Sequence, residues 1–319
     1  MSLVRIIKDW DWPDLRRQTP RHSGVWDNVE FTMETVTACD YVLVLNGAKE
    51  STTVCCPPRH VWSLVQEPPA EFHRALHRIP AYSARMFTTD PERVETPYVH
   101  SQAALPWHVD RDYDYLSTCT VPEKTRPLSW ITSTIRMLRG HRDRMAFLES
   151  IRDKLPLDLW GRGIRPLADK WEGLASYQYS LAIENYSNPF YWTEKLADCF
   201  LAWTMPVYYG CTRITDYFPA EAMIQIDIHQ PEIAIGKINE AIANNAWKHN
   251  LSAIAHAREL VLNRYQLFPF MVEQIRRFES IDGAVSAPPQ SVLIEPNKPA
   301  VPQRVLQSGL RRWFQVSGS

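Results

Sequence analysis

The sequence lacks a hydrophobic run long enough to cross a membrane. No window of about 18 uncharged apolar residues occurs along the 319 residues, and the apolar run within residues 1–14 is too short for a secretory signal peptide. A charge imbalance is also missing, because 35 lysines and arginines face 36 aspartates and glutamates, for a formal net charge of −1. Such a chain has no overall positive field to attract nucleic acid, so no nucleic-acid partner is expected.

Metal-binding and dinucleotide-binding patterns are missing as well. The six cysteines show no C-x-x-C spacing, and the ten histidines offer no H-x-x-x-H pair on a helix with a third ligand. No G-x-G-x-x-G follows a strand-like run, which disfavours a dinucleotide-dependent oxidoreductase. We therefore expect no metal and no bound cofactor, and we interpret the cysteines as buried thiols in a reducing cytoplasm.

What the sequence does contain is an alternation of strand-like and helical patterns. Short apolar or β-branched runs bounded by turn residues predict strands at residues 4–8, 41–45, 61–65, 86–89, 129–132, 157–160, 179–183 and 207–209. Helical periodicity predicts helices at residues 142–154, 193–203, 233–244 and 250–277. This βαβ alternation is typical of an α/β protein with parallel sheets, and 319 residues suffice for two domains.

Composition changes suggest where the domains end. We predict a first domain over residues 1–120, a second over 121–282 that includes the C-terminal helices, and a proline-rich linker with a basic amphipathic tail over 283–319. One interpretation of the tail, in which Arg311 and Arg312 adjoin Trp313 and Phe314, is a contact with a membrane surface or a partner. The alternative is a loosely docked or disordered terminus.

The segment from Tyr177 to Gly210 is the most informative part of the chain. Here Glu184 and Asn185 follow a predicted strand, while Glu194 and Lys195 begin a predicted helix. Carboxyl ends of parallel strands border the ligand crevice of α/β sheets, and a helix N-terminus favours phosphate. The sequence therefore predicts a site for an anionic ligand.

Three ordered blocks resemble glycosyltransferase family 10, the α1,3 and α1,4 fucosyltransferases. Residues 183–195 read IEN, YSNPF and YWTEK, in the order of the family's FEN, variable loop and Y-[VI]-T-E-K. Ile183 replaces the usual Phe, and Trp192 replaces a β-branched residue. SWITSTIRMLRGHRDRMAFLESI at residues 129–151 contains the family's R-x-x-F as Arg144 and Phe147, although Thr134 stands where Asn is usual. SLVQEPP at residues 63–69 is similar to the family's acidic-Ser-Pro or acidic-Pro-Pro element. Apart from these three blocks, DLWGRG at residues 158–163 resembles the family's strand-Gly-Arg turn.

This resemblance implies a GT-B-like fold, with two Rossmann-like domains facing each other across a cleft, the first binding the acceptor and the second the donor. It implies an inverting enzyme that transfers fucose from GDP-fucose, as co-substrate, to a hydroxyl such as the 3-OH of N-acetylglucosamine or glucose. An oligosaccharide or glycolipid acceptor such as lipopolysaccharide O-antigen would suit a bacterial-type enzyme that is cytoplasmic or peripheral at the inner membrane. Animal Golgi members of the family carry a membrane anchor, which is not found here.

The resemblance also assigns roles to individual residues. Glu67 matches the proposed catalytic base, and its alternative is to cap a turn or pair with an arginine. Arg144 and Lys195 match residues that bind the donor diphosphate, a task to which guanidinium and ammonium groups are suited. Arg142 is an alternative to Arg144, since both lie in a basic cluster whose charges could simply face water.

The remaining donor-binding candidates are Glu194, Asn185 and Tyr191. Glu194 matches an acidic residue that holds the ribose or the sugar, but an acid in a first helical turn also complements the helix dipole. Asn185 matches a polar neighbour of the same ligand. Tyr191 lines the sugar pocket in one interpretation and is a packing residue in the other.

Three other functions remain open. Asp110, Asp112 and Asp114 have the D-x-D spacing of metal-dependent nucleotide-sugar enzymes, although no clear strand ends there. The same fold could also take a different GDP-sugar, or bind a carbohydrate or nucleotide without turnover.

Overall fold

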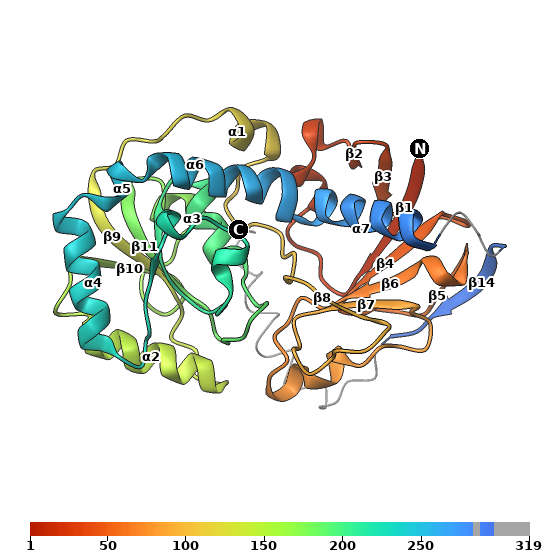
Figure 1. The fold of residues 1–319 in the computed structure, drawn as a ribbon, viewed down its shortest axis with the longest axis horizontal. Coiled ribbons are helices and arrows are strands. Elements are labelled where there is room, and N and C mark those ends of the chain that lie inside the picture. Colours follow the sequence, from red (N-terminus) through yellow and green to blue (C-terminus); the bar gives the residue numbers. More distant parts are fainter. Residues whose placement is uncertain (283–287, 297–319) are drawn as a thin grey trace, which may run out of the picture. The chain divides into compact units, whose positions relative to one another are not determined.

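The computed structural model describes residues 1–282 and 288–296 (Figure 1). Contacts between Cα atoms divide the chain into two compact units. The first unit contains Met1–Arg16, Gly24–Ser101 and the described residues from Ile275 onward, and the second contains Arg17–Ser23 and Gln102–Gln274. Each unit has its own sheet, as described below.

The first unit is built on a seven-stranded sheet in the order β2-β3-β1-β4-β6-β7-β8. All neighbouring strands are parallel except β2 and β3. The strands are β1 Ser2–Lys8, β2 Val25–Trp26, β3 Val29–Thr32, β4 Tyr41–Leu45, β6 Val61–Leu64, β7 Arg85–Thr88 and β8 Tyr98–His100. The chain leaves β1 on one side to form β3 and returns to its other side to form β4, so the strand order reverses between β1 and β4.

The end of the described chain completes the first unit. β14 (Gln290–Ile294) pairs antiparallel with β5 (Thr52–Cys56), and Ile294 is fully buried in an apolar cluster with Val54 and Val61. Within the predicted proline-rich linker these five residues thus form a strand, because Val292 and Ile294 give them an apolar face to bury. The basic tail lies outside the described residues.

The second unit contains a five-stranded, fully parallel sheet in the order β10-β9-β11-β12-β13. The strands are β9 Arg126–Ile131, β10 Leu157–Trp160, β11 Tyr177–Ile183, β12 Met205–Tyr209 and β13 Ile224–Gln225. Here the order reverses between β9 and β11. Two α/β units with largely parallel sheets confirm the predicted fold class.

Helices surround the second sheet (Figure 1). The α-helices of the chain are α1 Tyr113–Thr118, α2 Arg139–Ile151, α3 Glu194–Leu201, α4 Pro231–Ala243, α5 Ala246–His249, α6 Leu251–Leu260 and α7 Leu267–Asp282. Short 3-10 turns are η1 Leu15–Gln18, η2 Pro20–His22, η3 Pro58–His60, η4 Glu71–His77, η5 Lys170–Gly173, η6 Ile214–Asp216 and η7 Ala220–Ala222, and η8 Val261–Tyr265 is a π turn. None of the helices in the described ranges is both long and apolar enough to cross a membrane.

The long helix predicted over residues 250–277 is interrupted. The π turn η8 follows α6, Gln266 is extended, and α7 starts at Leu267. The break places Pro269 in the first turn of a new helix, where its missing N–H breaks no helical hydrogen bond.

The unit boundaries differ from the predicted ones for reasons of packing. Trp107, Val109 and Leu116 are buried in the same core cluster as α3, so residues 102–120 belong to the second unit. Phe278 of α7 lies edge-on to Trp62 at 5.3 Å, and this end of the helix belongs to the first unit. Such contacts join residues far apart in sequence, which no local pattern reveals.

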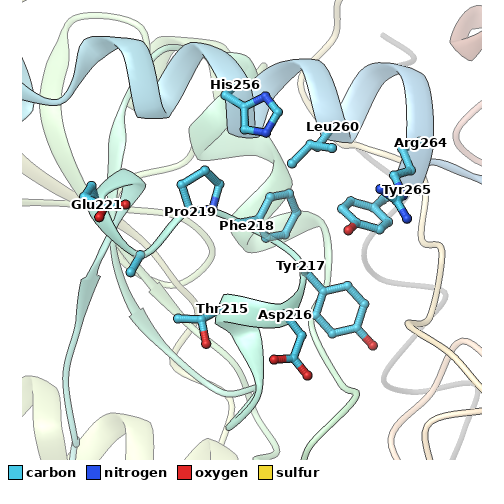
Figure 2. Close-up of a pocket in the computed structure, with 11 residues that line it drawn as sticks. Thr215, Asp216, Tyr217, Phe218, Pro219, Glu221, His256, Leu260, Arg264 and Tyr265 are labelled. Carbon is cyan, nitrogen blue, oxygen red and sulfur yellow. The ribbon is translucent and has the colours of Figure 1, made fainter.

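An open hollow of about 470 Å³ lies on the second unit (Figure 2). Residues 215–221 form one wall, and His256, Leu260, Arg264 and Tyr265 form the other. None of the predicted donor-binding residues lines it. The hollow is therefore separate from the site described next.

Candidate active site

Polar residues lie at the carboxyl ends of β9 and β11, and one of them, Asn185, is a predicted donor-binding residue. Thr132 and Ser133 follow β9, and Glu184 and Asn185 follow β11. The strand order reverses between these two strands, which is where ligands bind in open α/β sheets. Thr132 is 7% exposed, and its hydroxyl has no hydrogen-bond partner in the described part of the chain.

Glycines allow the loops at this edge to approach closely. Gly161, in the DLWGRG turn, has a φ of +114°, and a Cβ there would lie 1.9 Å from the carbonyl oxygen of Thr132. Gly140 lies against Asn185, and its Cβ would be 1.8 Å from the Asn185 carbonyl oxygen. The start of α2 therefore rests directly on the loop that follows β11.

Substituting Gly140 should disturb this edge. In Gly140→Ala the backbone of α2 or of Asn185 has to move, so we expect a loss of about 1–3 kcal/mol of stability and weaker GDP binding. Gly236→Ala is the matched control, because nothing lies within 4 Å of a Cβ on that helical glycine and alanine is the better helix former there. Thermal unfolding and GDP titration of both variants check this, and unchanged stability of Gly140→Ala would contradict the close approach.

Glu184 fixes the start of α3. Its carboxylate accepts hydrogen bonds from the backbone N–H of Thr193 at 2.8 Å, from the Thr193 hydroxyl at 2.8 Å, and from Nζ of Lys195 at 3.2 Å. Burial raises the pKa of Glu184, although Lys195 opposes this. Glu184 thus joins the end of β11 to the first turn of α3.

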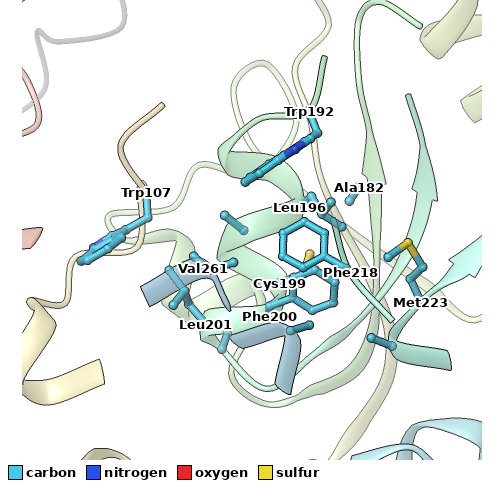
Figure 3. Packing of buried hydrophobic residues seen from close by; sticks show 14 of the residues in the cluster. Trp107, Ala182, Trp192, Leu196, Cys199, Phe200, Leu201, Phe218, Met223 and Val261 are labelled. Atoms are coloured by element: carbon cyan, nitrogen blue, oxygen red, sulfur yellow. The ribbon is translucent and has the colours of Figure 1, made fainter. Parts of the chain in front are cut away.

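The other side of α3 is anchored by apolar packing (Figure 3). Leu196 and Phe200 are fully buried, and Phe200 lies 5.0 Å from Phe218 between ring centroids. Trp192, just before the helix, packs edge-on to the same Phe218 at 5.1 Å. The polar first turn of α3 is therefore held rigidly at the edge of the sheet.

A chain of buried charges surrounds that first turn. Glu194 Oε1 lies 3.5 Å from Lys195 Nζ and 3.4 Å from Lys170 Nζ, and Lys170 also binds Asp198 at 2.8 Å. Burial alone would raise the pKa of Glu194, but Lys195 and Lys170 hold it well below its usual range. Asp198 in turn accepts the backbone N–H of His108 at 2.8 Å. The acids of this cluster are therefore all paired.

Arg144 lies beside these charges. Arg144 lies on α2 and is 6% exposed. Burial lowers the pKa of its guanidinium, while the negative charges of Glu184 and Glu194 raise that pKa. Within the described ranges its Nε donates to no acceptor, and no carboxylate lies within ion-pair distance. A buried guanidinium with free hydrogen-bonding capacity is suited to binding an anion.

Tyr191 and Asn185 complete the group. The Tyr191 hydroxyl donates to Asn185 Oδ1 at 3.4 Å, and Tyr191 is 3% exposed. Asn188 holds the connecting loop by accepting the backbone N–H groups of Phe190 and Tyr191. The second unit thus brings together all the residues that the sequence predicted for donor binding.

Sequence reasoning missed Lys170, Asp198 and His108. Lys170 begins the 3-10 turn η5 and His108 lies in a loop, neither of them in a motif, and they meet α3 only through tertiary packing. Asp198 offered a signal, because it follows Glu194 by one helical turn on a helix that is otherwise apolar on its inner face.

Glu67 lies at the carboxyl edge of the first sheet, two residues beyond Val65. Its side chain is 37% exposed, and Oε2 lies 3.5 Å from Nδ1 of His73. The preceding Gln66 is buried, with its backbone N–H on Asn46 Oδ1 at 2.8 Å and its Oε1 accepting from Trp10 Nε1 at 3.0 Å. Glu67 is therefore an accessible carboxylate on a firmly held backbone, and the side chain beside it is His73 rather than the arginine of the alternative interpretation.

The D-x-D aspartates have structural partners in the second unit. Asp112 caps α1 by accepting the Tyr115 N–H at 2.8 Å, and Asp114 accepts the Arg21 N–H at 2.8 Å. Asp110 pairs with Arg17 at 3.1 Å. Across residues 1–282 and 288–296, no cluster of three His, Cys, Asp or Glu side chains could hold a metal ion.

The five-stranded parallel sheet, with polar loops where the strand order reverses, has the arrangement at which open α/β folds bind ligands. Residues 121–246 match the family model described as glycosyltransferase family 10 (fucosyltransferase) C-term. Residues 121–246, all within the second unit, thus resemble the C-terminal domain of this fucosyltransferase family.

Individual relatives agree with this assignment. The chain is 29% identical over 178 residues to the 3-galactosyl-N-acetylglucosaminide 4-alpha-L-fucosyltransferase FUT3 of Homo sapiens, covering 54% of this chain and 46% of the relative. It is 33% identical over 112 residues to the 4-galactosyl-N-acetylglucosaminide 3-alpha-L-fucosyltransferase FUT6 of Pongo pygmaeus, covering 34% and 30%. The matched segments thus span less than half of these relatives.

This chain is also similar in fold to a crystal structure of alpha1,3-fucosyltransferase with GDP. The match covers 84% of this chain and 92% of the other, with 14% sequence identity and a TM-score of 0.48.

Proposed function

We propose that the protein is an inverting, metal-independent glycosyltransferase that transfers fucose from GDP-fucose to a sugar hydroxyl. The observation that carries this proposal is the buried Arg144, whose Nε has no partner among the described residues, beside the paired Glu184, Lys195 and Glu194. A diphosphate would supply the acceptor oxygens that this guanidinium lacks. The family match of residues 121–246 supports fucose as the transferred sugar.

The donor would be held by residues of the second unit. Arg144 and Lys195 bind the diphosphate and stabilise the charge that develops on it as the sugar leaves. Glu194 and Asn185 hydrogen-bond the ribose or the fucose, and Tyr191 positions Asn185 through its hydroxyl. Two cations in one crevice supply the positive charge that a metal would otherwise provide.

The transfer step needs a base. Glu67 accepts the proton of the acceptor hydroxyl, whose oxygen attacks C1 of fucose, while the C1–O bond to GDP breaks with inversion. For the acceptor we propose the 3-OH of an N-acetylglucosamine or glucose unit in an oligosaccharide or glycolipid, such as lipopolysaccharide O-antigen. Galactosyl-N-acetylglucosaminide acceptors in the names of the relatives support this class.

Calorimetric titration tests the donor assignment. In the presence of a chelator, we expect GDP and GDP-fucose to bind, and UDP-glucose and UDP-N-acetylglucosamine to bind much more weakly or not at all. GDP-mannose shows how far the pocket discriminates between sugars. Binding of UDP-sugars alone, or binding of GDP only after Mn²⁺ is added, would contradict the proposal.

A further inference from the structure

The peptide that carries Glu67 is held from two sides by buried groups. On one side, Gln66 is tied to Asn46 and Trp10, which follow β4 and β1. On the other side, Nε2 of His77 lies 3.1 Å from the carbonyl oxygen of Glu67 itself. His77 ends the 3-10 turn η4 and is completely buried. A fully buried histidine bonded to the backbone of a proposed base is not explained by packing alone.

The hydrogen bonds of His77 define its tautomer. A carbonyl oxygen can only accept, so Nε2 carries the hydrogen and donates it to Glu67. Nδ1 lies 2.6 Å from the Thr88 hydroxyl and accepts its hydrogen, while the Thr88 oxygen accepts the backbone N–H of Asp90 at 3.0 Å. Every polar atom of the neutral ring is thereby satisfied, and the chain of bonds runs from the end of β7 to Glu67.

The electrostatic surroundings favour this neutral ring. Burial lowers the pKa of His77 to about 4, although the charge of Asp90 and the carbonyl groups of Glu67 and Pro68 oppose it. Asp90 Oδ2 forms an ion pair with Arg93 Nε at 3.6 Å. The nearby His73, one turn earlier on η4, also lowers the pKa of His77. The Nε2–H tautomer is therefore the state present at ordinary pH.

Resting on the proposed function of Glu67, we propose that His77 is a positioning residue for that carboxylate. Its Nε2–H fixes the Glu67 peptide, and this sets the direction in which the side chain leaves the edge of the sheet. Residues 68 and 69 are prolines, which cannot donate backbone hydrogen bonds that would hold the loop in another way. Without His77, Glu67 would remain at the edge but would lose its alignment toward the acceptor hydroxyl.

Two amides of different length test this role. His77→Gln can place an N–H near the position of Nε2, whereas the amide of His77→Asn reaches only the position of Nδ1. The assay follows GDP release from GDP-fucose, with N-acetyllactosamine as acceptor and with water alone. We expect His77→Asn to lose at least about tenfold in kcat with unchanged GDP affinity, and His77→Gln to stay within about threefold of the wild type.

A destabilised variant separates alignment from stability. Val54→Ala removes buried apolar volume from β5, which pairs with β14 outside the seven-stranded sheet, so it should lower the unfolding temperature and leave kcat unchanged. Equal losses in His77→Asn and His77→Gln, or wild-type turnover in His77→Asn, would overturn the inference. If Glu67→Gln were fully active, the proposed base would fail instead, and the two failures are thus distinguishable.

Unfolding as a function of pH tests the neutral ring without any turnover. The unfolded histidine takes up a proton as pH falls below about 6.5, whereas the folded one does so only near pH 4. His77 therefore contributes stability that is present above pH 6.5 and is lost as pH falls to about 4. We expect the stability advantage of the wild type over His77→Gln to shrink across this range, and a constant difference would contradict the neutral, anchored state.

Discussion

Replacing Glu67 with glutamine is expected to abolish most transfer while leaving donor binding intact. Glutamine has the size of glutamate but cannot accept a proton at neutral pH, so the step that activates the acceptor hydroxyl is lost. General-base catalysis contributes about 10²- to 10⁴-fold, and we expect kcat to fall by that amount. The predicted donor residues belong to the second unit, so the affinity for GDP should not change.

The measurement pairs turnover with calorimetry on the same preparations. Glu50→Gln is a suitable control, since Glu50 is an exposed carboxylate of the first unit and should keep wild-type turnover. A Glu67→Gln protein that transfers fucose at the normal rate would remove Glu67 from the mechanism. A protein that also loses GDP binding would show that the change acts on folding rather than on proton transfer.

The sequence predicted eight strands correctly but missed β2, β3, β5, β8, β13 and β14. Tyr41–Leu45 and Leu157–Trp160 form strands with the predicted bounds, and β11 extends the predicted strand by two residues. β4 is buried at every position, as its uninterrupted apolar run indicates. Local composition is sufficient for such elements.

The donor-binding group was predictable for a different reason. Glu184 and Asn185 lie close in sequence to Glu194 and Lys195, and a strand followed by a short loop and a helix brings such residues to one edge of a sheet. Arg144 depended on the family resemblance, because the sequence alone offered Arg142 equally. The structure separates them, with Arg142 exposed and Arg144 buried.

Contacts between distant segments could not be predicted in this way. His108 and Asp198 are separated by 90 residues, and His77 and Thr88 by 11. No periodic pattern encodes the hydrogen bond that joins either pair. The polar support behind each predicted site residue is therefore visible only in the folded chain. These supporting residues decide how firmly the reactive groups are held.

Replacing Arg144 with methionine should weaken GDP binding and at the same time stabilise the protein. The guanidinium is buried, and its Nε has no acceptor among the described residues, so folding desolvates a polar group without a compensating bond. An unsatisfied buried polar group costs about 1–3 kcal/mol, and methionine, which fills similar space without that polarity, should regain about this amount. Glu184 and Glu194 keep their lysine partners, so no acid is left unpaired.

The affinity of Arg144→Met for GDP should fall while its stability rises. Each hydrogen bond from a charged group contributes about 1.5–3 kcal/mol, so losing two guanidinium bonds to the diphosphate should weaken GDP affinity about 100-fold or more. Arg142→Met, on the exposed side of the same helix, should change neither property appreciably. Calorimetry and thermal unfolding of both variants decide between the two arginines. Only for an arginine that is retained to bind the ligand should the variant protein bind GDP less tightly and also unfold at a higher temperature. An Arg144→Met protein that is destabilised and still binds GDP normally would instead make this arginine a structural residue.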